Sequence, residues 1–106
     1  MRTFPKQLGE LRQRVTALGT ALRSKTRDEL IARGQEPPEL WDVEGREAEV
    51  SVTVEPKLDG SLRVVVQGFM PPRRLRRPSS VALHGFYRRQ GGAIEPMPDH
   101  EFYEFG

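Results

Sequence analysis

The stretch that decides the fold is residues 48–70, which read AEVSVTVEPKLDGSLRVVVQGFM. In its first half apolar residues alternate strictly with polar ones, and the apolar set is Val50, Val52 and Val54. This period of two is typical of a strand with one buried face. Residues 62–70 form a second run rich in strand-forming residues. This run is too short to cross a bilayer. We therefore predict two antiparallel strands joined by a tight turn.

The register of this hairpin follows from its faces. A two-residue loop, Asp59-Gly60, would place polar side chains among the valines. A three-residue loop, Leu58-Asp59-Gly60 with Gly60 in the left-handed conformation, instead pairs Val54 with Val64 and Val52 with Val66. The sequence therefore predicts the three-residue loop.

The N-terminal region, residues 4–34, has a helical pattern. Its apolar stripe has the spacing 3-4-3-4 and consists of Leu8, Leu11, Val15, Leu18 and Leu22. Thr3 is the expected N-cap of the first helix, and either Ser24 or Thr26 could cap a second helical turn. Gly34 is the expected left-handed stop, because prolines follow it at 37 and 38.

The rest of the chain predicts further strands and loops. Residues 35–47 form an acidic connector whose only large apolar residues are Leu40 and Trp41. Residues 71–80 form an arginine-rich loop with three prolines, residues 81–89 a strand, and residues 93–97 an edge strand. The tail, 98–106, fits a short helix or a further edge strand equally well.

The predicted fold class is α+β, with an N-terminal amphipathic helix packed on a four-stranded antiparallel β-meander (residues 48–97). We expect a single domain over residues 1–106, since this length suits one core. The second face of the sheet offers Val65 and Phe86, so the tail or a second subunit is expected to cover it.

Composition restricts the class of protein. With 36% hydrophobic and 30% charged residues, a folded domain is expected. The absence of cysteine excludes disulfide bridges and thiolate metal sites. No apolar run has the length of a signal peptide or a membrane span, so we expect a cytoplasmic protein with no membrane contact.

Charge is arranged in blocks. Residues 35–60 carry eight acidic and two basic side chains, whereas residues 61–90 carry seven basic and no acidic ones. The candidate contacts to a partner or to phosphates are Arg73, Arg74, Arg76, Arg77, Arg88 and Arg89. The interpretation that we favour needs no partner: the basic loop neutralises the chain's own acidic segments.

The segment Glu55-Pro56-Lys57-Leu58-Asp59-Gly60 resembles the adenylylation motif of NAD-dependent DNA ligases. The resemblance implies a covalent nucleotide on Lys57, but no lysine lies in the 46 residues after Gly60, where that family has further lysine-bearing motifs. The hairpin loop itself accounts for Asp59-Gly60. His84, His100 and the carboxylates around His100 show no convergent spacing for a metal or a general base.

We therefore predict no catalytic, cofactor-binding or metal site. The function that we favour is a small non-catalytic protein-binding or adaptor module, with homodimerisation as one form of it. The alternative is a nucleic-acid-associated protein that contacts phosphates through residues 71–80. A small enzyme with an unrecognised site comes third, and no small-molecule substrate is indicated.

Overall fold

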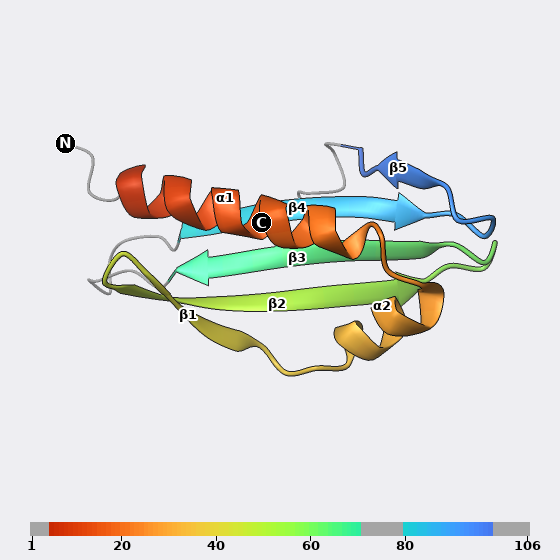
Figure 1. Cartoon of the computed structure of the whole chain (residues 1–106), viewed down its shortest axis with the longest axis horizontal. Coiled ribbons are helices and arrows are strands. Elements are labelled where there is room, and N and C mark those ends of the chain that lie inside the picture. Colours follow the sequence, from red (N-terminus) through yellow and green to blue (C-terminus); the bar gives the residue numbers. More distant parts are fainter. Residues whose placement is uncertain (1–4, 71–79, 99–106) are drawn as a thin grey trace.

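The computed structural model describes residues 5–70 and 80–98. One five-stranded antiparallel sheet has its strands in sequence order, and two helices lie on one of its faces (Figure 1). The helices are α1 (Pro5–Leu22) and α2 (Arg27–Gly34); the strands are β1 (Glu39–Val43), β2 (Arg46–Pro56), β3 (Leu62–Met70), β4 (Ser80–Arg88) and β5 (Ile94–Pro96). The α+β meander is confirmed. Neither described helix is long and apolar enough to span a membrane.

The predicted number of four strands is wrong, because the acidic connector contains β1. This strand pairs with β2 through a two-residue loop, Glu44-Gly45. Both loop residues have positive φ, 51° at Glu44 and 84° at Gly45, as the turn that matches strand twist requires. The connector therefore belongs to the sheet.

The register of the β2–β3 hairpin is confirmed. Val54 pairs with Val64 and Val52 with Val66. The Lys57 N–H donates to the Ser61 carbonyl at 2.8 Å, and Gly60 has a φ of 87°. The loop thus has three residues with glycine in the left-handed position.

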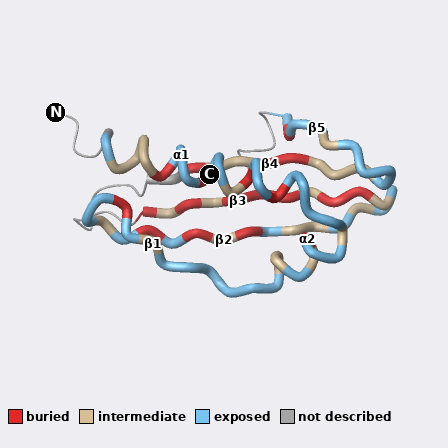
Figure 2. The backbone as a smooth tube through the Cα atoms, in the orientation of Figure 1, coloured by how far each residue is buried: buried red, intermediate tan, exposed pale blue. Residues whose placement is uncertain are grey.

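Helix α1 lies across β3 and β4, and its buried stripe includes Leu11, Val15 and Leu22. Figure 2 shows the buried backbone concentrated along the central strands and the inner side of this helix. Gly68 of β3 lets α1 approach closely, since a Cβ there would lie 2.9 Å from side-chain carbons of Leu11 and Val15.

Helix α2 packs on β2, and of the two predicted caps Thr26 is the one that the structure uses. Thr26 caps it, with a reciprocal capping box to Glu29. The predicted left-handed stop at Gly34 is wrong, because the C-cap is Gln35 in a right-handed conformation. Gly34 instead permits close packing, since a Cβ there would lie 2.8 Å from Cβ of Val54.

The second face of the sheet differs in part from prediction. Phe86 faces α1 and is fully buried in the main core, so its predicted place on the second face is wrong. Val65 does lie on that face and is 1% exposed. Met97 packs there over Gly85, the cross-strand partner of Val65. Thr3, residues 71–79 of the predicted loop and the tail from 99 onward lie outside the described residues.

Candidate functional site

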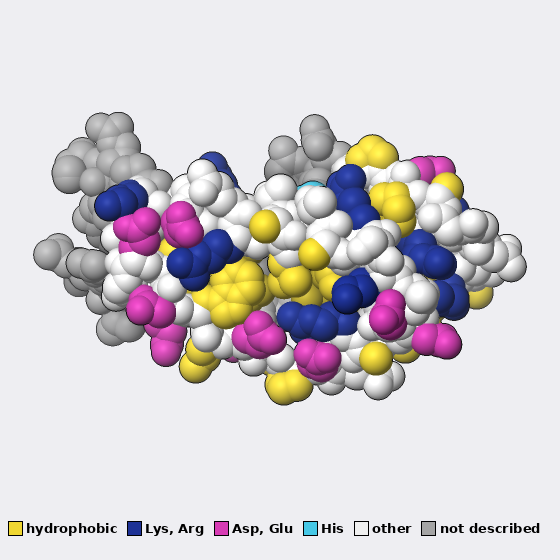
Figure 3. Space-filling model, in the orientation of Figure 1, with side chains coloured by type: hydrophobic (Ala, Val, Ile, Leu, Met, Phe, Trp, Pro, Cys, Tyr) yellow, Lys and Arg dark blue, Asp and Glu magenta, His cyan; other side chains and the backbone are white. Residues whose placement is uncertain are grey.

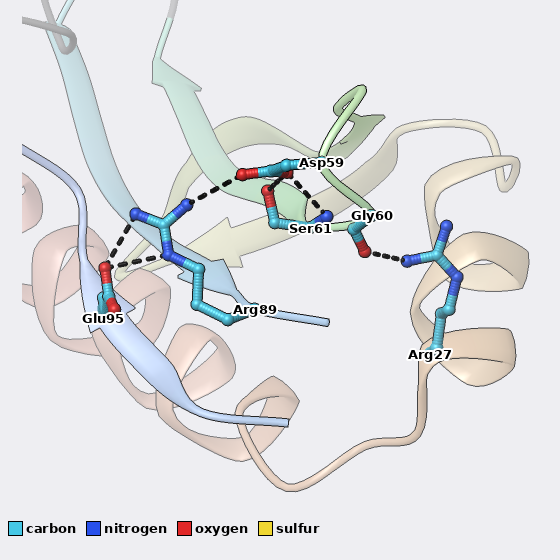
Figure 4. Close-up of polar contacts among 6 residues, drawn as sticks. All are labelled: Arg27, Asp59, Gly60, Ser61, Arg89 and Glu95. Atoms are coloured by element: carbon cyan, nitrogen blue, oxygen red, sulfur yellow. Dashed lines mark hydrogen bonds and ion pairs between the residues drawn. The ribbon is translucent and has the colours of Figure 1, made fainter. Parts of the chain in front are cut away.

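The β2–β3 hairpin tip, residues 57–61, is hydrogen-bonded by side chains of the tip itself and of α2. The Asp59 carboxylate accepts hydrogen bonds from the Ser61 backbone N–H at 2.9 Å and from the Ser61 hydroxyl at 2.5 Å. Arg27, the first residue of α2, donates to the Gly60 carbonyl at 2.7 Å. Figure 4 shows these contacts on both sides of the loop.

Arg89, just after β4, ties the tip to the β5 side of the sheet. Its guanidinium lies 2.7 Å from Oε1 of Glu95 and 3.8 Å from Oδ2 of Asp59 (Figure 4). It also stacks over the Tyr87 ring, 4.7 Å from the ring centroid. The hydrogen bond to Glu95 raises the pKa of Arg89, and the hydrogen bonds from Ser61 lower the pKa of Asp59.

A shallow groove of about 560 Å³ lies between the hairpin tip and β5. The lining residues are Lys57, Leu58, Asp59, Ser61, Tyr87, Arg89, Glu95, Pro96 and Pro98. Its walls combine apolar surface with an ion-pair network. Leu58, at the apex of the turn, is as exposed to solvent as a leucine in an extended peptide, so its side chain contacts almost nothing.

The cations of this groove have carboxylate partners within the described residues. Lys57 Nζ lies 3.3 Å from Glu55, which is also 2.6 Å from Arg63. These hydrogen bonds, from Lys57 first, lower the pKa of Glu55. A phosphate group in this groove would therefore have to compete with carboxylates of the same chain.

The predicted contact residues fall in different places. Arg89 lies in the groove, whereas Arg88 lies opposite Leu62 and Ile94 on the α1 side of the sheet. The four arginines 73, 74, 76 and 77 lie outside the described residues, as does His100. His84 packs against Gly19 of α1 and Arg23, the residue that follows this helix. Over residues 5–70 and 80–98, no three side chains of metal-binding type come together.

The sequence reasoning placed the hairpin tip correctly but assigned no role to Leu58. The signal was a large apolar residue at the apex of a polar turn, where small or polar residues are the rule.

Comparisons with known proteins find no matching family model, no matching curated protein and no matching solved structure. A functional conclusion must therefore be drawn from this chain's own residues.

Proposed function

We propose that this chain is a non-catalytic protein-binding module that presents Leu58, on its rigid hairpin tip, to an apolar pocket of another protein. The observation that carries the proposal is the complete exposure of a leucine on a loop whose neighbouring backbone groups are hydrogen-bonded within the fold. Burying a leucine side chain contributes about 1.5–3 kcal/mol, so a partner would gain this on contact.

The rigidity of the tip favours binding. An exposed side chain on a mobile loop loses conformational freedom when it is captured, and this loss opposes association. Here the loop backbone is already fixed by Arg27 at Gly60 and by Asp59 at Ser61. Only the Leu58 side chain itself would have to be ordered.

The groove beside Leu58 has the composition of a binding surface. Tyr87 and Arg89 belong to the residue types that dominate binding energy in interfaces, and the guanidinium stacked on the Tyr87 ring lies in the same groove as Pro96 and Pro98. The ion pairs around them would form the polar rim of the contact.

The nucleic-acid alternative receives less support from the described residues. Arg89 is engaged by Glu95 and Asp59, and a phosphate would have to displace those carboxylates. Phosphate binding through residues 71–80 stays a prediction from the sequence, as do homodimerisation and the absence of catalysis.

A site-specific crosslink tests the proposal. A photoreactive amino acid at position 58 should form a covalent adduct with one distinct protein in the cells that naturally produce this chain. The same group at Gln13, exposed on α1, is the matched control and should not form that adduct. An adduct between two copies of the chain would identify the partner as a second subunit.

The identified protein then permits a quantitative test. Leu58→Ser should weaken binding about 10- to 100-fold, because the apolar contact is lost, and should leave the unfolding midpoint unchanged. Equal crosslinking from positions 58 and 13, or unchanged affinity of Leu58→Ser, would refute the proposed role of Leu58.

A further inference from the structure

A second large apolar side chain, Leu40 of β1, is also exposed, at 67%. It lines a depression of about 380 Å³ at the β1–β2 hairpin together with Trp41, Asp42, Gly45 and Glu47. This depression shares no lining residue with the groove at the hairpin tip. Leu40 lies opposite Glu49, seven residues along β2 from Pro56, which places it roughly 23 Å from that end of the strand.

The face that Leu40 occupies is acidic. Leu40 pairs with Glu49 and Asp42 pairs with Glu47, so all four side chains point to the same side of the sheet. Two carboxylates directly opposite each other on a sheet repel and lower stability. No basic residue lines the depression. Figure 3 views the molecule from the α1 side and shows further acidic side chains along the edge where β1 lies; the face that carries Leu40 is turned away in this view.

The free edge of β1 is closed to an added strand at one position. In a two-residue hairpin the residues next to the loop are hydrogen-bonded to each other, so the backbone groups of Asp42 point outward. Arg14 of α1 donates to the Asp42 carbonyl at 3.0 Å and is itself held by Glu10 at 2.9 Å. Strand addition would have to displace this arginine. A partner at β1 therefore binds through side chains.

We propose that Leu40, Asp42, Glu47 and Glu49, together called the β1 surface, bind a basic segment of another chain in which an apolar side chain is flanked by lysine or arginine. The apolar side chain would contact Leu40, and the flanking cations would relieve the repulsion between Asp42 and Glu47. A basic partner is favoured over an acidic or purely apolar one because its positive charges complement the carboxylates of this face.

Two separate binding surfaces would make the module an adaptor that joins two proteins. Residues 73–77 of this chain, Arg-Arg-Leu-Arg-Arg, have the required order, so a second copy also carries such a segment. The β1 surface uses none of the residues on which the hairpin-tip proposal depends. Each of the two proposals can therefore fail without the other.

Intrinsic fluorescence provides a direct assay, because Trp41 is the only tryptophan. The probe is the blocked peptide Arg-Arg-Leu-Arg-Arg, titrated into the wild-type chain and into a variant with Arg73, Arg74, Arg76 and Arg77 replaced by glutamine. That variant removes competition from the chain's own basic segment. We expect a saturable change in emission that weakens as salt rises, because surface charges are then screened.

The controls separate the apolar from the charged contribution. Peptides with serine in place of the central leucine, or glutamine in place of the arginines, should each bind about tenfold more weakly or not at all. Leu40→Ser and Glu47→Gln should weaken binding, whereas Leu58→Ser should not change it. The proposal is overturned if neither protein gives a saturable signal, if the glutamine peptide binds equally well, or if Leu40→Ser has no effect.

Discussion

Alanine at Gly19 should destabilise the protein, although the same change usually stabilises a helix. Glycine within a helix costs about 1 kcal/mol relative to alanine. At Gly19, however, a Cβ would lie 2.0 Å from Cδ2 and 2.7 Å from Cγ of the His84 ring. Gly9, in the same helix, has no heavy atom within 4 Å of its Cβ position. The two glycines thus form a matched pair.

The expected sizes follow from these surroundings. Gly9→Ala should raise the free energy of unfolding by roughly 1 kcal/mol. Gly19→Ala makes the same helical gain but must displace His84 or lift α1, and overpacking of this kind costs about 1–3 kcal/mol. The two variants should therefore differ by about 1–3 kcal/mol. In a domain of this size each kcal/mol shifts the melting temperature by about 4 °C.

Thermal unfolding followed by circular dichroism measures this difference. In a His84→Ala background the ring is gone, so Gly19→Ala should stabilise α1 as Gly9→Ala does, and the double-mutant cycle should recover the clash as a coupling energy. If Gly19→Ala raises the melting temperature of the wild-type protein as much as Gly9→Ala, the close approach of α1 to β4 is wrong.

Three further outcomes are expected. Val52→Asp should cost more than about 3 kcal/mol, because Val52 is 4% exposed and the new charge would be buried without a partner; an unchanged melting temperature would contradict the strand assignment. Thr26→Ala should lower the free energy of unfolding by about 1 kcal/mol in urea denaturation, through loss of the hydrogen bond from the Glu29 N–H, whereas an intact midpoint would exclude a role for the capping box. Burial, and secondarily Arg23, lowers the pKa of His84, so the unfolded chain binds the proton more readily; stability should fall as the pH drops below about 6.5, and His84→Gln should reduce this slope.

The β2–β3 hairpin could be predicted because separate signals agree on it. The alternation around Val52 fixes which side chains share a face, and of the two loops that Asp59-Gly60 allows, only the three-residue one keeps valine opposite valine. The sequence left Ser24 and Thr26 as alternative caps of the second helix, and only Thr26 is followed three residues later by a glutamate that completes the capping box. Local chemistry and long-range packing require the same structure at these places.

Strand β1 escaped prediction for a physical reason that concerns Leu40. Trp41 and Val43 point toward the core, and Leu40 and Asp42 point away from it. Because Leu40 is apolar although it points outward, apolar and polar residues do not alternate along β1, and the period of two that marks a strand is missing. Gly34 was misjudged for a different reason: glycine serves both left-handed turns and close packing, and only the position of Val54 shows which use applies.

The two exposed leucines are the places where this chain departs from its own pattern. Elsewhere in the described residues the large apolar side chains lie at least partly within the fold, and the sequence could be interpreted on that basis. Leu40 occupies an outward strand position and Leu58 the apex of a turn, and neither contributes to the core. Substituting serine at either site should therefore leave folding intact, which means that stability gives no reason for leucine there. A local rule that is broken without structural benefit points to a contact outside the chain.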